Sequence, residues 1–258
     1  MHSRHYKILD MLQGGRLEIV SAARKLGVSE MTLRRDLREL EKQKLLIQVK
    51  GGALPLRPLG GEAAITDPLL NLKTALAQKL YERLMPCETL FLSTGSTVLR
   101  FAVLLARYNT RPSTVITNSL SVASALFRSS CKVILLGGEM RTSQMDLAGP
   151  AAERILTEYH VEWLVTGCDG AITPWGFYTS DLSLSNLEKK SIGIAEHTAV
   201  ITDSSKFSHK SLSRFAAPEE IDILVTDKNI PQKDLESLKG FPHLEIITVD
   251  YESAPMAK

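Results

Sequence analysis

The sequence predicts an α/β protein in which an N-terminal winged helix-turn-helix precedes a mostly parallel, doubly wound α/β domain. Two short helices joined by a glycine-containing turn lie within the first sixty residues, and apolar strand-like runs alternate with helical stretches from Thr89 onward. The chain has 258 residues, of which 44% are hydrophobic and 23% charged. It therefore fits one or two folded domains and is not disordered throughout.

The first predicted helix covers residues 6–12 and ends at Gly14-Gly15, and residues 16–20 are expected to be extended. Ser21 is the candidate N-cap of a second helix over residues 22–26. These assignments give a short helix, an extended stretch and a second short helix before the turn.

The turn follows directly. Gly27 occupies the place of a C-cap glycine, and Ser29 is the candidate N-cap of a longer helix over residues 30–40. Two helices separated by such a turn are typical of a helix-turn-helix.

The longer helix has two different faces. Leu33, Leu37 and Leu40 form one apolar stripe, and Arg35 lies nearly opposite it on the helical wheel. The remaining outward positions are Met31, Thr32, Arg34 and Arg38. Arginine can bond guanine bidentately and can also contact phosphates, so this face suits the major groove of DNA. The alternative is an ordinary solvated amphipathic helix.

A candidate wing follows this helix. Residues 45–49 read as a strand, and Lys50 then precedes Gly51-Gly52 and Ala53. A basic residue at a Gly-Gly turn resembles the wing of a winged helix, from which Lys50 could reach a phosphate or the minor groove.

The charge of the chain is consistent with this division. Residues 1–60 contain 12 Lys/Arg and 6 Asp/Glu, a net +6, whereas the remainder contains 19 and 23, a net −4. The whole-chain net charge of +2 excludes a uniformly basic nucleic-acid coat but not a local basic patch. Taken alone, the asymmetry is equally compatible with chance clustering.

The large domain begins after a break in periodicity. Residues 54–61 contain two prolines and two glycines, which indicates a linker, and residues 71–84 are helical by pattern. The expected strands are residues 89–92, 115–118, 132–136, 163–167, 198–203 and 223–227, each followed by a loop or a helix. Near-continuous apolar strands of this kind favour a parallel sheet covered on both faces.

Ligands of such sheets bind beyond the carboxyl ends of the strands. The loop 93–97, Ser-Thr-Gly-Ser-Thr, offers backbone N–H groups, hydroxyls and a helix N-terminus to an anion, and Lys206 adds a cation on the same edge. Taken singly, the loop 93–97 and the turn that carries Lys206 could each be an ordinary turn. The loop is not a Walker A motif, because no G-K-[ST] follows it.

The cysteines and histidines indicate neither a metal site nor a disulfide framework. Cys87, Cys131 and Cys168 are far apart, and neither C-x-x-C nor H-E-x-x-H occurs. We expect reduced thiols in a cytoplasmic protein without a metal or cofactor. The sequence predicts no signal peptide and no membrane span, because its apolar runs are too short.

The run Val-Ser-Glu-Met-Thr-Leu-Arg-Arg-Asp-Leu at residues 28–37, followed by Gly-Gly-Ala at 51–53, resembles the DeoR family of bacterial transcription regulators. The resemblance extends over roughly residues 3–230. It implies a helix-turn-helix over about 20–39, with Arg34 and Arg35 contacting operator DNA. The DNA-contacting residues expected from pattern and resemblance together are Ser29, Met31, Thr32, Arg34, Arg35, Arg38 and Lys50.

The resemblance also implies a C-terminal domain that senses a phosphorylated sugar and is similar in fold to ribose-5-phosphate isomerase and coenzyme A transferases. The implied effector-binding residues are Gly95, Ser96, Thr97, Asn118, Asp169, Gly170 and Lys206. The implied organisation is a DNA-binding domain at 3–58, a linker at 59–72, a sensing and oligomerisation domain at 73–235 and a C-terminal segment at 236–258.

This chain departs from the family pattern at three positions. The family usually has an acidic residue where this chain has Ser93. On the helix after Asp181 it tends to have a Glu followed by a Lys, where this chain has Leu184 and Glu188, with Lys189 and Lys190 adjacent. The effector, or the way it is bound, is therefore expected to differ from that of other members.

The leading hypothesis is a DNA-binding regulator, a repressor of a carbohydrate operon, that acts as a homo-oligomer and is modulated by a sugar phosphate. The alternative is a sugar-phosphate isomerase with an accessory DNA-binding domain, for which Asp169, Glu188 and Asp203 are candidate bases. A dimerisation scaffold is the third hypothesis.

Overall fold

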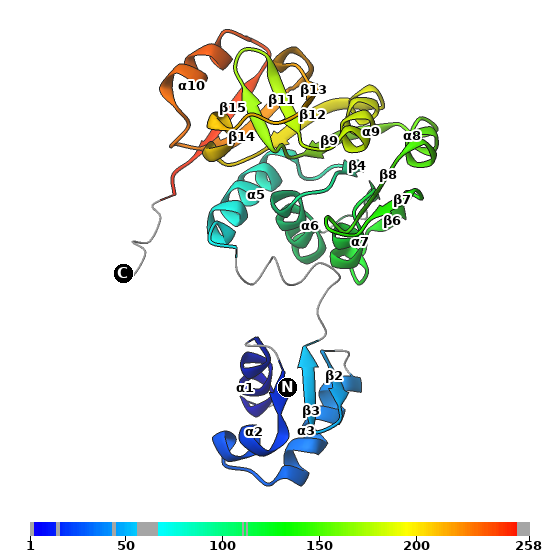
Figure 1. Cartoon of the computed structure of the whole chain (residues 1–258), viewed down its shortest axis with the longest axis vertical. Coiled ribbons are helices and arrows are strands. Elements are labelled where there is room, and N and C mark those ends of the chain that lie inside the picture. Colours follow the sequence, from blue (N-terminus) through cyan, green and yellow to red (C-terminus); the bar gives the residue numbers. More distant parts are fainter. Residues whose placement is uncertain are drawn as a thin grey trace. The chain divides into compact units, whose positions relative to one another are not determined.

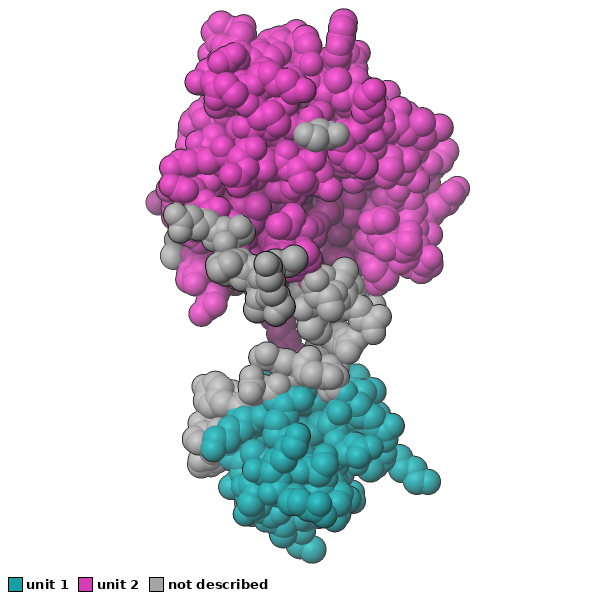
Figure 2. All heavy atoms as spheres, turned by 60° about the vertical axis from the view of Figure 1, so that its left-hand side comes forward, with its two compact units in different colours: residues 1–65 teal, residues 66–258 magenta. Residues whose placement is uncertain are grey.

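The computed structural model describes residues 3–13, 16–42, 45–55, 67–109, 111 and 113–251. The chain divides into two compact units, residues 1–65 and 66–258, which are drawn in different colours in Figure 2. The expected ends at Gly14-Gly15 and most of the expected linker lie outside the described residues. The last residues of that linker belong to a helix, because α5 (Leu70–Leu84) begins before residue 72.

The first unit is a winged helix-turn-helix (Figure 1). Its elements are α1 (Ser3–Gln13), β1 (Leu17–Glu18), α2 (Ile19–Leu26), α3 (Glu30–Lys42), β2 (Leu46–Val49) and β3 (Gly52–Pro55). The strands form an antiparallel sheet in the order β1-β3-β2. The side chains that fill its core are apolar groups from all three helices and the sheet: Ile8, Leu12, Leu17, Ile19, Ala22, Ala23, Leu33, Leu37, Leu40, Leu46 and Ala53.

The second helix starts earlier than the sequence predicts. The expected N-cap Ser21 is wrong: α2 begins at Ile19, with Glu18 at the N-cap, and the Ser21 hydroxyl donates to the Glu18 carbonyl at 3.3 Å within the first turn. Ile19, the first residue of α2, is 3% exposed and belongs to the core of the unit, so tertiary burial overrides the local capping preference of Ser21.

The second unit contains a seven-stranded sheet in the order β15-β14-β12-β9-β4-β5-β6, with all neighbouring strands parallel. Its strands are β4 (Thr89–Leu92), β5 (Thr114–Thr117), β6 (Lys132–Leu135), β9 (Val161–Thr166), β12 (Ala195–Ile201), β14 (Ile223–Asp227) and β15 (Glu245–Val249). The parallel, doubly wound expectation is confirmed. Residues 245–249, within the expected C-terminal segment 236–258, form β15 and complete the sheet beside β14.

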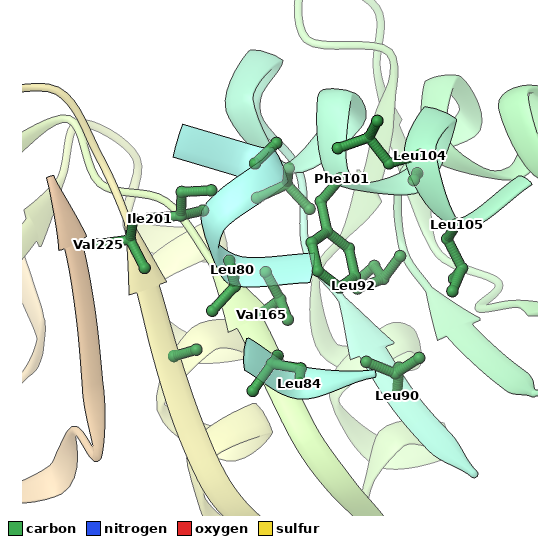
Figure 3. Close-up of a cluster of buried hydrophobic side chains, with 14 of the residues drawn as sticks. Leu80, Leu84, Leu90, Leu92, Phe101, Leu104, Leu105, Val165, Ile201 and Val225 are labelled. Carbon is green, nitrogen blue, oxygen red and sulfur yellow. The ribbon is translucent and has the colours of Figure 1, made fainter. Parts of the chain in front are cut away.

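Helices cover both faces of this sheet. On one face, α5, α6 (Ser96–Tyr108) and α7 (Leu120–Leu126) pack on Leu90, Leu92 and Val165, as Figure 3 shows for α5 and α6. On the other face, α8 (Pro150–Leu156) and α9 (Leu182–Gly193) pack on Phe91 and Leu164. Alternate residues of one strand thus enter opposite cores, which explains the continuous apolar runs of the sequence.

Two smaller sheets were absent from the sequence prediction. One is the hairpin β7 (Glu139–Arg141) and β8 (Asp146–Ala148); the other has the order β10-β11-β13, from Gly170–Ile172, Gly176–Thr179 and Ser213–Ala216. The 3-10 helices η1 (Ser204–Ser208) and η2 (Pro218–Glu220) and the helix α10 (Gln232–Lys239) complete the unit. No helix among the described residues is long and apolar enough to cross a membrane.

Candidate functional site

The orientation of α3 is fixed by its caps and by its inner apolar stripe. Gly27 is left-handed at φ 66°, and the Thr32 amide donates to Ser29 Oγ at 3.2 Å, so the expected C-cap and N-cap are both present. Leu33, Leu37 and Leu40 are fully buried. Cap and stripe together determine which side of α3 is turned away from the core.

The outward side of α3 carries the predicted arginines. Met31 is 82% exposed, and Arg34, Arg35 and Arg38 are exposed as well. Arg34 has a carboxylate neighbour, Glu30, at 3.8 Å, whereas Arg35 and Arg38 have no ion-pair partner among the described residues. Two unpaired guanidinium groups on one exposed helix face can bond base edges or phosphates.

The buried acidic residue of α3, Asp36, has a structural role that had no signal in the sequence. Asp36 is 5% exposed and accepts two hydrogen bonds from Arg4 of α1, from Nε at 2.5 Å and from Nη2 at 3.0 Å. The Arg4 guanidinium lowers the pKa of this carboxyl. This ion pair joins the inner side of α3 to α1, so Asp36 is not available to repel DNA phosphates.

The wing is held from its base. Lys50 is exposed at the turn between β2 and β3, its carbonyl accepts from Arg16 Nη2 at 2.9 Å, and the Gly51 carbonyl accepts from the Ile19 amide at 3.0 Å. A side chain at Gly52 would lie 2.1 Å from the Leu17 carbonyl oxygen, which explains the second glycine. The first glycine, Gly51, has φ 79°.

The second unit contains a cavity of about 550 Å³ at the carboxyl ends of β4, β9 and β12. Its lining comes from the loops that follow these strands, from the turn of the β7–β8 hairpin, from β11 and α9, and from Lys73 of α5. A cavity of this size accommodates a small polar ligand.

One wall of the cavity is the predicted glycine loop. Gly95, Ser96 and Thr97 line it, and α6 begins at Ser96, so the amide groups of its first turn lack intrahelical acceptors. Gly95 has φ 128°, a conformation that L side chains rarely adopt. The loop therefore presents backbone donors to the cavity, as an anionic group requires.

Asp169 and Lys206 form another wall. The Asp169 carboxylate accepts from the Ser180 amide at 2.8 Å, from the Ser180 hydroxyl at 2.7 Å and from Thr179 Oγ1 at 3.2 Å. Burial raises the pKa of Asp169, but these hydrogen bonds and the positive charge of Lys206 outweigh burial and hold the pKa below its ordinary value. The carboxylate is thus ionised and oriented by β11.

Two predicted effector-binding residues are not part of the lining among the described residues. Asn118 is fully buried; its side-chain amide donates to the Leu147 carbonyl at 3.0 Å and thereby anchors β8. Gly170 lies where a Cβ atom would be 2.4 Å from the His209 carbonyl oxygen, so its role is close packing of β10. Both residues support loops that reach the cavity.

The hairpin contributes a cation that the sequence analysis missed. Arg141 lines the cavity and donates to the buried Asp146 from Nε at 2.8 Å and from Nη2 at 2.6 Å, while Nη1 lies 3.0 Å from Asp181 at the N-cap of α9. Burial alone would lower the pKa of Arg141, but the two carboxylates raise it overall. Arg141 therefore ties the hairpin to α9 across the cavity.

A buried carboxyl group lies at the floor. Glu188 is 3% exposed; its Oε1 accepts from the Ser93 hydroxyl, and its Oε2 accepts from Thr166 Oγ1 at 2.9 Å. Burial raises the pKa of Glu188 to about 7, although these two hydroxyls act in the opposite direction. Leu184, one turn earlier on α9, also lines the cavity. Ser93 therefore contacts Glu188 directly, and Leu184 lines the same cavity.

Comparison with known proteins identifies both units. Residues 4–57 match the DeoR-like helix-turn-helix domain, and residues 70–228 match the DeoR C terminal sensor domain. A protein of Escherichia coli O157:H7 whose name assigns it to transcriptional repression of the aga operon is 30% identical over 92% of this chain and 90% of its own length. The transcriptional regulator GlpR of Haloferax volcanii is 30% identical over 83% of this chain and 85% of its own.

A solved structure of ribose 5-phosphate isomerase A from Methanocaldococcus jannaschii is 19% identical, with a TM-score of 0.41, over 54% of this chain and 55% of that one. The matched relatives, including UlaR of Shigella sonnei at 29% identity over 92% of this chain and 95% of its own, are named as regulators, which sets the isomerase alternative aside. The chain belongs to the DeoR family of transcriptional regulators, with an N-terminal DNA-binding unit and a C-terminal sensor unit.

Proposed function

We propose that the protein represses an operon of carbohydrate metabolism by binding operator DNA through α3 and the wing. The observation that carries this proposal is the exposure of Arg35 and Arg38 on the side of α3 opposite its buried leucines, without a carboxylate partner among the described residues. These arginines read base edges in the major groove, and Lys50 contacts the backbone from the wing. Ser29, Met31, Thr32 and Arg34 lie on or beside the same face.

The proposed effector is a phosphorylated sugar held in the cavity of the second unit. The amides at the start of α6 take the phosphate, and Lys206 contributes a positive charge. Asp169 is oriented to accept a hydrogen bond from a sugar hydroxyl. Relatives named for the aga operon and as an L-fucose operon activator support a carbohydrate link and leave the choice of repression to experiment.

The two units are proposed to communicate by differential binding. A sugar phosphate that prefers one arrangement of a homo-oligomer lowers the population of the arrangement in which paired N-terminal units meet the two operator half-sites. This scheme places the protein in the cytoplasm with its target DNA.

The DNA-binding proposal is tested with the full chain. Duplexes selected from a random-sequence pool would be titrated by fluorescence anisotropy at several salt concentrations. Arg35→Ala and Arg38→Ala are each expected to weaken the selected duplex by roughly five- to 150-fold, with little effect on unselected DNA.

Arg128→Ala, which removes an exposed arginine from the second unit, is the matched control and is expected to bind normally. Equal affinity of the wild type for selected and unselected duplexes would contradict the proposal.

A further inference from the structure

Glu188 lies at the point where the strand order of the large sheet diverges. From β4 the sheet continues to β5 and β6, and from β9 it continues the other way to β12, β14 and β15. The two hydroxyl donors of Glu188 come from the residue after β4, Ser93, and from the last residue of β9, Thr166. A crevice at such a divergence is where open α/β sheets bind ligands.

The hydrogen bonds of Glu188 leave capacity for a ligand. Above its pKa of about 7, Glu188 is an ionised carboxylate that can accept about four hydrogen bonds, and two of its donors are the hydroxyls of Ser93 and Thr166. The Thr166 hydroxyl also lies 3.2 Å from the Gly167 carbonyl, which gives it a second acceptor. Glu188 is therefore a buried acceptor that lines the cavity and is held by two separate strands.

The charged side chains that line the cavity determine which groups of a ligand can lie next to Glu188. The lining contains four carboxylate residues, Asp169, Asp181, Glu188 and Asp203, and three basic residues, Lys73, Arg141 and Lys206. Lys73 already pairs with Asp67 at 2.7 Å, and Arg141 with Asp146 and Asp181. The floor consequently favours a hydrogen-bond donor and disfavours a second anionic group.

We propose that Glu188 is a specificity-determining residue of the sensor cavity, which accepts a hydrogen bond from a hydroxyl or amino group of the phosphorylated sugar and rejects phosphorylated sugar acids. The proposal rests on the effector function proposed above. The ligand class is then a neutral or amino sugar phosphate, with its phosphate at the start of α6 and one of its hydrogen-bond donors at Glu188.

The test compares the wild type with Glu188→Gln and Glu188→Leu. The probes are D-ribose 5-phosphate, D-glucose 6-phosphate, D-galactose 6-phosphate, D-fructose 1-phosphate and D-glucosamine 6-phosphate, with 6-phospho-D-gluconate as the sugar acid and inorganic phosphate as the fragment. Binding is measured by calorimetry, and release of the selected DNA duplex is measured in parallel. Glu158→Gln, which changes an exposed carboxylate outside the lining, is the matched control.

The probes that bind the wild type are expected to lose roughly ten- to 100-fold in affinity in Glu188→Leu and less in Glu188→Gln, which keeps an acceptor oxygen. Inorganic phosphate is expected to bind all variants at least as tightly as the wild type, because removal of Glu188 takes away a negative charge. The sugar acid is expected to bind Glu188→Gln more tightly than the wild type.

Equal affinities of a sugar phosphate for the wild type and Glu188→Leu would overturn the inference and leave the effector function standing. The same holds for a wild type that binds 6-phospho-D-gluconate more tightly than the neutral sugars. If no sugar phosphate binds the wild type or releases DNA, the proposed effector function fails, and this inference fails with it. Normal far-UV circular dichroism of each variant establishes that a loss of binding is not a loss of fold.

Discussion

The buried Glu188 gives the second unit a pH dependence opposite to that of most carboxylates. Its pKa is about 7 in the folded protein against an ordinary value of 4.5. The folded unit therefore holds this proton more tightly than the unfolded chain does. The contribution of Glu188 to the free energy of unfolding is therefore largest below pH 4.5. It falls as the pH rises to about 7 and changes little above pH 7.

The size of the effect follows from the shift. One pKa unit corresponds to about 1.4 kcal/mol, so a rise from 4.5 to about 7 lowers the free energy of unfolding by at most roughly 3 kcal/mol between these pH values. Glu188→Gln has no proton to lose. As the pH rises, the free energy of unfolding of the wild type should therefore fall relative to that of Glu188→Gln by up to that amount.

Tryptophan fluorescence reports the relevant unit, because the two tryptophans of the chain, Trp163 and Trp175, both belong to residues 66–258. Urea titrations of the wild type and Glu188→Gln at pH 5, 6, 7 and 8 give the difference at each pH. Glu158→Gln is the control, and its solvent-exposed side chain leads us to expect a curve parallel to that of the wild type. A constant difference between wild type and Glu188→Gln, or one that favours the wild type at higher pH, would refute the reasoning.

Two further predictions concern packing. Leu37→Ala, which empties a fully buried position on α3, should lower the stability of the first unit by roughly 2–5 kcal/mol, whereas Met31→Ala, at an 82% exposed position of the same helix, should change it little. Circular dichroism melting of both variants checks this, and similar losses would contradict the assignment of faces. Gly170→Ala should cost the second unit roughly 1–3 kcal/mol, because its Cβ would lie 2.4 Å from a backbone oxygen. Gly193→Ala, with no atom within 4 Å, should be neutral in the same fluorescence-detected urea titration, and equal stabilities of the two variants would count against the contact.

The first unit could be predicted closely from the sequence because its signals are local. The left-handed Gly27, the cap at Ser29 and the leucine stripe of α3 each depend on residues within two turns of one another. The error at Ser21 arose where local capping preference competed with tertiary burial of Ile19, and burial decided the outcome. The long-range ion pair between Arg4 and Asp36 had no local signal.

Six of the seven strands of the large sheet were also predictable, because burial produces apolar runs; β15, in which only Val249 is buried, was missed. The β7–β8 hairpin was not predictable, since its strands have only three residues and β8 is also bonded to Asn118, far away in the sequence. The same separation concealed the contacts of Arg141 with Asp181 and of Glu188 with Ser93. The glycine loop was found because a helix N-terminus is a local anion site.

In the sensor unit, the cavity residues that the sequence predicts and those that it does not predict have different chemical roles. The part of the cavity that the sequence reveals consists of backbone donors at the start of α6, and such donors bind a phosphate without regard to what it is attached to. Glu188, which we propose to distinguish one sugar from another, reaches the cavity through folding, as does Arg141 of the hairpin. The glycine loop therefore predicts that this cavity takes a phosphate ester, whereas we propose that the choice among esters depends on Glu188. Substitution of Glu188 should for this reason change which sugar phosphate is preferred more than it changes the affinity for phosphate itself.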